Sequence, residues 1–313
     1  MRPQQGTTTM TQTMTHRTSS PRISVIIPTY NEAKNLPHVF GLLPEDLHEV
    51  IVVDGHSVDG TVDMAHSLRP DVVVVEQNRR GKGNAMACGF AAATGDILVM
   101  LDADGSADPR EIPRFVAALT GGADFAKGTR FSRGGGSSDI TRTRAWGNRW
   151  LNRAANVLFG TSYSDLCYGY NAFWAHCLPV LELDASDVGR NGKLWGDGFE
   201  IETIINTRVA KGKLVIIEVP SFEFPRIHGQ SNLNTWRDGF RVLWALVVER
   251  ANGIGRAAPV DRTRARALGA TVSSAADVEH MADRVEGSRD LDTLAELMAV
   301  SRIGMAEPRG DVA

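Results

Sequence analysis

The sequence predicts an α/β protein built on an open, mostly parallel sheet flanked by helices. Three observations support this fold class: short runs of β-branched residues recur in the first third of the chain, helix-length segments separate them, and the spacing between runs is roughly 25 residues. Strand, helix and strand in this rhythm are typical of right-handed crossover units. Ligands of such sheets bind beyond the carboxyl ends of the strands, so we expect the site there.

Four strands are predicted in the first third of the chain: ISVII at 23–27, EVIVV at 49–53, DVVVV at 71–75 and DILVML at 96–101. Their apolar residues are continuous rather than alternating, as in strands buried on both faces of a parallel sheet. The segments between them open with polar or glycine turns, which favour helix starts. Helices are therefore predicted within 35–43, 59–68 and 81–93.

The second half of the domain is less regular. The Gly/Ser-rich stretch at 132–139 predicts a mobile loop, and a helix is expected over 143–160. A further strand is predicted at 213–219 and a helix at 235–250. All six tryptophans lie between positions 146 and 244, so this half is aromatic while the first is aliphatic.

Three segments are predicted for the 313 residues. Residues 1–21 are polar and are expected to be a disordered N-terminal segment. Residues 22–252 carry the aromatic and aliphatic residues of one large domain, which the chain length allows. Residues 253–313 lack aromatic residues and are expected to be a partly helical or disordered tail, with a helix near 290–300.

Composition narrows the function classes. A formal charge of -3 disfavours nucleic acid as a partner. The three cysteines, Cys88, Cys167 and Cys177, have neither C-x-x-C spacing nor zinc-type histidine partners, which fits a reducing cytoplasm. The N-terminus lacks the apolar run of a signal peptide, and no stretch approaches the roughly 18 apolar residues of a spanning helix. We therefore expect a cytoplasmic location, with peripheral membrane contact left open.

The most specific feature is Asp102-Ala103-Asp104, directly after the strand at 96–101. Two carboxylates at i and i+2 beyond a strand end can approach one Mg²⁺ or Mn²⁺ ion, which completes its coordination shell with water and phosphate oxygens. A solvated turn is the competing interpretation. The metal interpretation gains support from PTYNE at 28–32 and VDGHSVDGT at 53–61, because three polar clusters then follow three strands.

In this ordered set the chain resembles glycosyltransferase family 2 enzymes with a GT-A fold, and most of all the dolichol- or polyprenol-phosphate mannosyl- and glucosyltransferases. The resemblance covers roughly residues 22–235. It implies that the first two loops surround the nucleotide base and ribose, and that the D-x-D pair binds the metal that bridges the donor diphosphate. The donor-binding residues implied are Pro28, Tyr30, Glu32, Asp54, Asp59, Lys82 and Asp102, and the metal ligands are Asp102, Asp104 and Ser106. Gly55 and His56 replace the usual Asp and Gly of the second loop.

The resemblance also implies an acceptor side. Gly128-Thr129-Arg130 resembles a G-S-R step, and SDLCYGY at 164–170 resembles an acceptor segment that includes Asp165. RIHGQSNL resembles an R-x-x-G-x-S-K-L element, which implies acceptor contacts from Arg226 and Ser231. Arg130 and Arg226 are predicted to contact phosphate, because the planar guanidinium suits phosphate oxygens. Surface salt bridges are the competing interpretation.

Three acidic residues near the start of a predicted helix leave two interpretations open. Asp197 and Glu200 are candidates for catalysis or for helix capping, whereas capping is favoured for Glu202. Together with Asp102, Asp104, Arg130 and Arg226, the first two complete the set of predicted catalytic residues.

The function that the resemblance implies is inverting transfer of a hexose, with mannose favoured, from GDP-mannose or UDP-glucose to a polyprenyl phosphate. A phosphomonoester needs no strong general base, since its second pKa is about 6. One alternative is a family 2 transferase that glycosylates a hydroxyl group of a sugar or natural product. The other is a non-catalytic nucleotide-sugar-binding protein.

Membrane contact, if present, is predicted to use the helix at 235–250. Its apolar residues Trp236, Phe240, Leu243, Trp244 and Val247 share one face, while Arg237 and Arg241 lie toward another. Packing of this face into the core is the competing interpretation.

Overall fold

The computed structural model describes residues 20–186, 192–229, 235–252 and 261–268. Its central sheet has the strand order β3-β2-β1-β4-β7-β5-β8. Its strands are β1 (Ile23–Thr29), β2 (Glu49–Asp54), β3 (Val73–Glu76), β4 (Ile97–Met100), β5 (Phe125–Thr129), β7 (Asn171–Trp174) and β8 (Ile216–Pro220). β7 is antiparallel to both its neighbours, and the remaining pairs are parallel. The predicted mostly parallel α/β sheet is confirmed.

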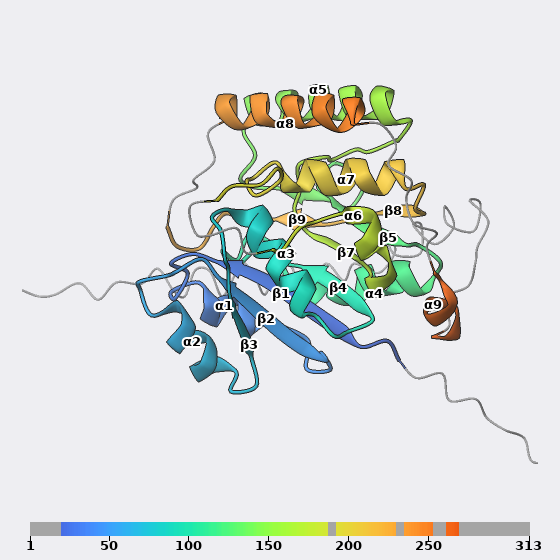
Figure 1. The fold of residues 1–313 in the computed structure, drawn as a ribbon. Helices are drawn as coiled ribbons and strands as arrows, with labels where there is room; N and C mark the ends of the chain where they lie inside the picture. Colours follow the sequence, from blue (N-terminus) through green and yellow to red (C-terminus); the bar gives the residue numbers. More distant parts are fainter. Residues whose placement is uncertain (1–19, 187–191, 230–234, 253–260, 269–313) are drawn as a thin grey trace, which may run out of the picture.

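The helices surround this sheet (Figure 1). They are α1 (Leu36–Phe40), α2 (Thr61–Leu68), α3 (Lys82–Ala92), α4 (Ile112–Thr120), α5 (Arg142–Phe159), α6 (Leu178–Leu181), α7 (Ile201–Lys211), α8 (Thr235–Ala251) and α9 (Thr263–Ala267). Two short 3-10 turns, at Pro109–Glu111 and Ala175–Cys177, precede α4 and α6. Figure 1 shows α5 and α8 side by side at the top, with α7 between this pair and the sheet.

The predicted burial of the first strands holds for β1, β2 and β4 but not for β3. Val25, Ile51 and Val99 are fully buried, as continuous apolar runs predict. β3 lies at the edge of the sheet, and Val73 is 38% exposed. The run at 71–75 therefore forms an edge strand, which pairs with β2 on one side and with no described strand on the other.

Part of the predicted mobile loop is a strand. β6 (Gly136–Ser137) lies inside the Gly/Ser-rich stretch and pairs in parallel with β9 (Phe222–Glu223). A Cβ atom at Gly136 would overlap the Phe222 ring, so the glycine allows this close approach. A partner strand far along the chain thus orders a segment whose composition suggests a loop.

The predicted tail contains a segment that packs against the domain. Ala265 of α9 is buried in the main core, and Arg262 forms two bonds to Asp124, at 2.7 and 2.6 Å. Arg264 lies 2.5 Å from Asp96. These contacts favour an end of the folded domain at 268 or beyond rather than at the predicted 252. The helix predicted near 290–300 lies outside the described residues.

Candidate functional site

A pocket of about 940 Å³ lies beyond the carboxyl ends of β1, β2 and β4. Three predicted loops reach it, through Tyr30 of the first, His56 of the second and Asp102 of the third. Parallel neighbours end at the same edge of a sheet, so loops that are distant in sequence meet there. Segments from α3, α5, α8 and the start of α7 complete the wall.

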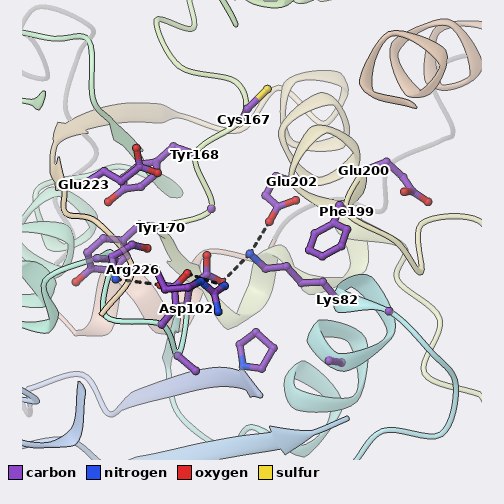
Figure 2. Close-up of a pocket in the computed structure, with 18 of the residues that line it drawn as sticks. Lys82, Asp102, Cys167, Tyr168, Tyr170, Phe199, Glu200, Glu202, Glu223 and Arg226 are labelled. Atoms are coloured by element: carbon purple, nitrogen blue, oxygen red, sulfur yellow. Dashed lines mark hydrogen bonds and ion pairs between the residues drawn. The ribbon is translucent and has the colours of Figure 1, made fainter. Parts of the chain in front are cut away.

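Lys82 pairs with two carboxylates in this pocket. Its Nζ lies 2.6 Å from Asp102 Oδ1 and 2.7 Å from Glu202 Oε1, and Figure 2 shows it between them. Burial by itself lowers the pKa of a lysine, but the charges of Asp102 and Glu202 outweigh it and raise the pKa of Lys82 above its ordinary value. A fixed positive charge therefore stands beside the first carboxylate of the D-x-D pair.

Arg226 connects the second carboxylate to the first loop. Its Nη2 lies 3.0 Å from Asp104 Oδ2, and its Nη1 lies 3.0 Å from Glu32 Oε1. Burial raises the pKa of Glu32, although bonds from Asn35 and Arg226 act against that rise. The backbone N–H of Ile227 also donates to the Asp104 carbonyl. The predicted RIHG element is thus held against the D-x-D loop.

The carboxylate pair suits a divalent cation that also binds substrate. The side chains of Asp102 and Asp104 are 36% and 16% exposed, and Ser106 lines the same pocket. Within the described ranges, no group of three or more His, Cys, Asp or Glu is placed to hold a metal. A site with two protein carboxylates is compatible with Mg²⁺ or Mn²⁺, because either ion can complete its coordination shell with water and phosphate oxygens.

Asp54 and Asp59 fix the shape of the two donor loops. Asp54 accepts hydrogen bonds from Ser57 N–H and the Thr29 hydroxyl, and Asp59 accepts one from Ala33 N–H. Neither carboxylate lines the pocket. Their predicted donor contact would therefore act through the loops, whereas Pro28, Tyr30 and Glu32 line the pocket directly.

His56 stands where the motif usually has glycine, and its backbone shows why. Its φ is 65°, in the left-handed region that glycine adopts most easily. The ring Nδ1 lies 2.5 Å from Glu76 Oε1, and the buried Nε2 has no hydrogen-bond partner among the described residues. The contact with Glu76 holds a residue with a strained backbone at the pocket wall.

Arg130 is buried and already holds two carboxylates. Its Nε and Nη2 donate to Asp165, at 2.7 and 2.9 Å, and its Nη1 donates to Glu223 at 2.9 Å. Asp165 is fully buried and also accepts from Asn148. Burial alone would raise the pKa of Asp165, but Arg130 holds it below its ordinary value. This geometry favours a structural role for the pair over the predicted acceptor contacts.

Asp197 and Glu200 differ in accessibility. Asp197 is 2% exposed, and both its oxygens bind the buried guanidinium of Arg79. Gly83 N–H donates to the Asp197 carbonyl, and a Cβ atom at Gly83 would overlap the neighbouring Gly196 carbonyl. Asp197 therefore joins this loop to α3, and this geometry favours a structural role over the predicted catalytic one. Glu200 lines the pocket.

Three further residues of the site have roles that the sequence does not predict. Glu202, which the sequence favours as a helix cap, is the second partner of Lys82. Glu223 and Tyr168 line the pocket beside Arg130, whose guanidinium lies 4.9 Å from the Tyr168 ring centroid. The predicted acceptor contact Ser231 lies outside the described residues.

Comparison with known proteins gives a consistent family. The model of "Glycosyl transferase family 2" matches residues 24–176. The chain is 32% identical to the polyprenol monophosphomannose synthase of Mycolicibacterium smegmatis, over 75% of this chain and 92% of that protein. It is 33% identical to the undecaprenyl-phosphate mannosyltransferase of Micrococcus luteus, over 68% of this chain and 88% of that protein.

A solved structure supports the fold. Glucosyl-3-phosphoglycerate synthase from Mycobacterium tuberculosis, in complex with Mn²⁺, UDP and glucosyl-3-phosphoglycerate, superimposes with a TM-score of 0.56 at 22% identity. The match covers 74% of this chain and 80% of that one. In the part of this chain that the structure describes, no helix is long and apolar enough to cross a membrane.

Proposed function

Because the chain belongs to glycosyl transferase family 2 and has the GT-A fold, we propose that it transfers a hexose, with mannose favoured, from a nucleotide-diphosphate sugar to a polyprenyl phosphate. The two named relatives act on lipid phosphates of this class, as their names state. GDP-mannose is the favoured donor and UDP-glucose the second candidate.

The observation that carries the proposal is the pairing of each D-x-D carboxylate with a cation inside one pocket. Lys82 pairs with Asp102, and Arg226 pairs with Asp104. Two acidic and two basic groups therefore lie together in the pocket, where a metal ion and a diphosphate would each find partners of opposite charge. Bound Mg²⁺ or Mn²⁺, held by Asp102 and Asp104 with Ser106 as the predicted third group, would stabilise the charge of the departing nucleoside diphosphate.

The protein's own residues then position the reactants. Tyr30 is 61% exposed at the pocket wall and offers its ring to the nucleotide base. Lys82 and Arg226 offer charge-assisted contacts to phosphate oxygens when these displace their carboxylate partners. The acceptor phosphate is itself an anionic nucleophile near neutral pH, so attack at the anomeric carbon with inversion needs orientation rather than proton removal.

The hydroxyl-acceptor alternative makes a different demand. An alcohol acceptor needs a carboxylate base within hydrogen-bond reach. Since Asp197 is bound to Arg79, Glu200 is the remaining candidate of the predicted pair, and it lines the pocket. The lipid-phosphate reaction is preferred because it uses the cations already present and requires no base.

The location proposed for this reaction is the cytoplasmic face of a membrane. A polyprenyl acceptor resides in a bilayer, and the three free cysteines fit a reducing compartment.

A donor panel tests the proposal. Purified protein with Mn²⁺ is given GDP-mannose, UDP-glucose and related donors, together with a short-chain polyprenyl phosphate, and the lipid is examined by mass spectrometry. We expect a hexose added to the phosphate, and none in the presence of a chelator. Transfer to hydroxyl acceptors with no product on the lipid phosphate would instead establish the alternative, and Glu200→Gln would then abolish it.

A further inference from the structure

We propose that α5 and α8 together form a docking face for an anionic lipid bilayer, placed so that a membrane-embedded acceptor enters the pocket directly. This inference rests on the proposed function and identifies the protein surface that would contact the bilayer in which the acceptor lies. We call the surface the α5–α8 face. It consists of the exposed apolar residues Trp146, Trp150, Val157, Phe240, Leu243, Trp244 and Val247, together with Arg142, Arg149 and Arg153.

The α5 half of this face was not anticipated from sequence. Trp146 is 65% exposed, Trp150 55% and Val157 84%. At 100° per residue these three side chains fall within about 40° of one another on the helix. Asn148, Asn152 and Ala155 lie on the opposite side and are buried. The helix therefore turns its largest aromatic residues to solvent and its amides to the protein, the reverse of an ordinary surface helix.

The α8 half shows the same inversion. Phe240 is 73% exposed and Trp244 58%, whereas Ala245 and Leu246 are fully buried and Glu249 nearly so. Glu249 accepts hydrogen bonds from Arg208, Lys211 and Trp195 on the inner side. The predicted amphipathic stripe thus points outward, which rules out core packing for Phe240, Leu243, Trp244 and Val247. The side chain of Trp236 lies outside the described residues.

The two stripes form one surface because the helices are neighbours. Figure 1 shows α5 and α8 side by side at the outer edge of the molecule. Leu246 of α8 packs in a small core with Ala155 of α5, Tyr163 and Leu166. A contiguous exposed apolar surface of this kind marks an interaction site, since water-exposed apolar area is otherwise kept small.

Charge identifies the occupant as an anionic membrane. The whole chain carries a formal charge of -3, yet α5 contains four arginines and no acidic residue. Arg142, Arg149 and Arg153 are exposed and flank the tryptophan stripe within about 60° of Trp146 on the helix. Tryptophans bordered by arginines suit the interface of a bilayer, where the rings enter the headgroup region and the guanidinium groups meet lipid phosphates.

The pocket reaches the same two helices. Arg144, Gly147 and Leu151 of α5, and Gly239 and Val242 of α8, line the pocket from the inner side of the pair. A lipid whose phosphate lies in the pocket would therefore pass between or beside the two helices to place its hydrocarbon chain in a bilayer on the outer side. Because no described helix spans a membrane, a surface of this kind would supply the contact with the acceptor's bilayer.

Vesicle cosedimentation tests the proposal. The full chain is mixed with vesicles of phosphatidylcholine, or of equal parts phosphatidylcholine and phosphatidylglycerol. We expect binding to the anionic vesicles that weakens as salt is added. The double variant Trp146→Glu/Trp150→Glu and the single variant Trp244→Glu should each lower the partition coefficient at least tenfold. Arg149→Gln/Arg153→Gln should lower it by roughly fivefold for each arginine on anionic vesicles alone.

The matched control is Leu68→Glu, which adds the same charge at a 39% exposed apolar residue of α2, away from α5 and α8 in Figure 1. It should bind vesicles like the wild type. Thermal unfolding shows that each variant is folded. The proposal would be overturned if the wild-type protein did not bind anionic vesicles, or if the tryptophan variants bound them with wild-type affinity. It would also be overturned if light scattering showed a dimer that the tryptophan substitutions dissociate, and the wild-type protein did not bind vesicles.

Turnover separates this inference from the proposed function. With a water-soluble short-chain polyprenyl phosphate, the tryptophan variants should keep the wild-type rate, whereas with a long-chain acceptor in vesicles they should lose at least tenfold. Vesicle binding without transfer to any lipid phosphate would refute the proposed function and leave the docking face standing. If the tryptophan variants and the wild type had equal transfer rates with the short acceptor and also with the long-chain acceptor in vesicles, the docking face alone would be refuted.

Discussion

Lys82 Nζ lies 2.6 Å from Asp102 Oδ1, so the first carboxylate of the D-x-D pair is bound to a side-chain ammonium group. Glu202 shares that lysine at 2.7 Å. A metal ion at Asp102 would therefore compete with Lys82, and a diphosphate that accepted hydrogen bonds from Lys82 would leave Asp102 available to the metal. This relationship predicts that donor and metal bind cooperatively.

Lys82→Met tests that coupling. We expect Mn²⁺ alone to bind more tightly than in the wild type, because the competing ammonium is gone. Donor turnover should fall about ten- to a hundredfold, since one charge-assisted contact contributes roughly 1.5 to 3 kcal/mol. Titration calorimetry with Mn²⁺ and then with nucleotide measures both effects, and the exposed Lys34→Met is the control. Unchanged Mn²⁺ affinity would show that Lys82 and the metal do not compete.

Asp102→Ala and Asp104→Ala should each give a folded protein without metal-dependent turnover. Each change removes one of two carboxylates proposed to bridge cation and diphosphate. Rates over a range of Mn²⁺ concentrations, with thermal unfolding as the check on folding, measure the effect. Two fully active variants would remove the metal from the mechanism.

Arg226→Lys should reduce kcat/KM about ten- to a hundredfold while changing stability little. Arg226 bridges Glu32 and Asp104 with separate nitrogens and is 27% exposed, and a lysine cannot reach both carboxylates. Steady-state kinetics and a thermal melt provide the two readouts. A wild-type rate for this variant would shift support toward the hydroxyl-acceptor alternative.

Arg130→Lys should behave differently and lower the free energy of unfolding by roughly 1 to 3 kcal/mol, since it breaks a buried bidentate pair with Asp165. Denaturant unfolding measures this. A purely kinetic defect with unchanged stability would favour the phosphate contact predicted from sequence over the structural role.

Arg262→Ala should destabilise the domain more than Arg264→Ala. Burial alone would raise the pKa of Asp124, but bonds from Arg262, His176 and Val215 N–H hold it below its ordinary value. Without Arg262, a mostly buried carboxylate loses its closest cation, at a cost of roughly 1 to 3 kcal/mol. Arg264 is 66% exposed and serves as the control.

Truncation provides a second test of the same contact. A chain of residues 20–268 should be more stable to denaturant than one of residues 20–252, because it keeps Ala265 and Arg262 in place. Equal stability of the two would return the domain boundary to 252.

Glu111 should make stability fall as pH rises. Burial raises its pKa from 4.5 to about 7, although bonds from Ser221 and the charge of Arg114 act the other way. In the unfolded chain the group ionises near 4.5, so between pH 4.5 and 7 the folded state binds more protons and loses up to about 3 kcal/mol as pH rises. Unfolding of Glu111→Gln should lack this decline, and the exposed Glu45→Gln should keep it. Parallel profiles for wild type and Glu111→Gln would contradict the assignment.

Local sequence was sufficient for the motif-bearing half of the fold. Continuous apolar runs predicted β1, β2 and β4, and the polar residues after each run predicted loops that do meet at one pocket. β5 and β7 escaped prediction because their composition is mixed: FAKGT contains a buried lysine, and NAFW begins with a buried asparagine. Their neighbours in the sheet, rather than their own composition, make them strands.

Tertiary structure alone decided which charged groups are available. Arg79 and Asp197 are 118 positions apart, Arg130 and Glu223 are 93 apart, and Asp124 and Arg262 are 138 apart. The first two pairings give Asp197 and Arg130 structural partners, although their motifs also allowed a catalytic role. The third joins the segment at 262 to the domain, although its composition resembles that of the tail. The sequence by itself determined the fold class, the D-x-D position and the family, since these depend on neighbours along the chain. The ion-pair partner of each charged residue, and the exposure of Trp146 and Trp244 to solvent, depend on packing between segments that are distant in sequence. A local sequence pattern carries no information about that packing.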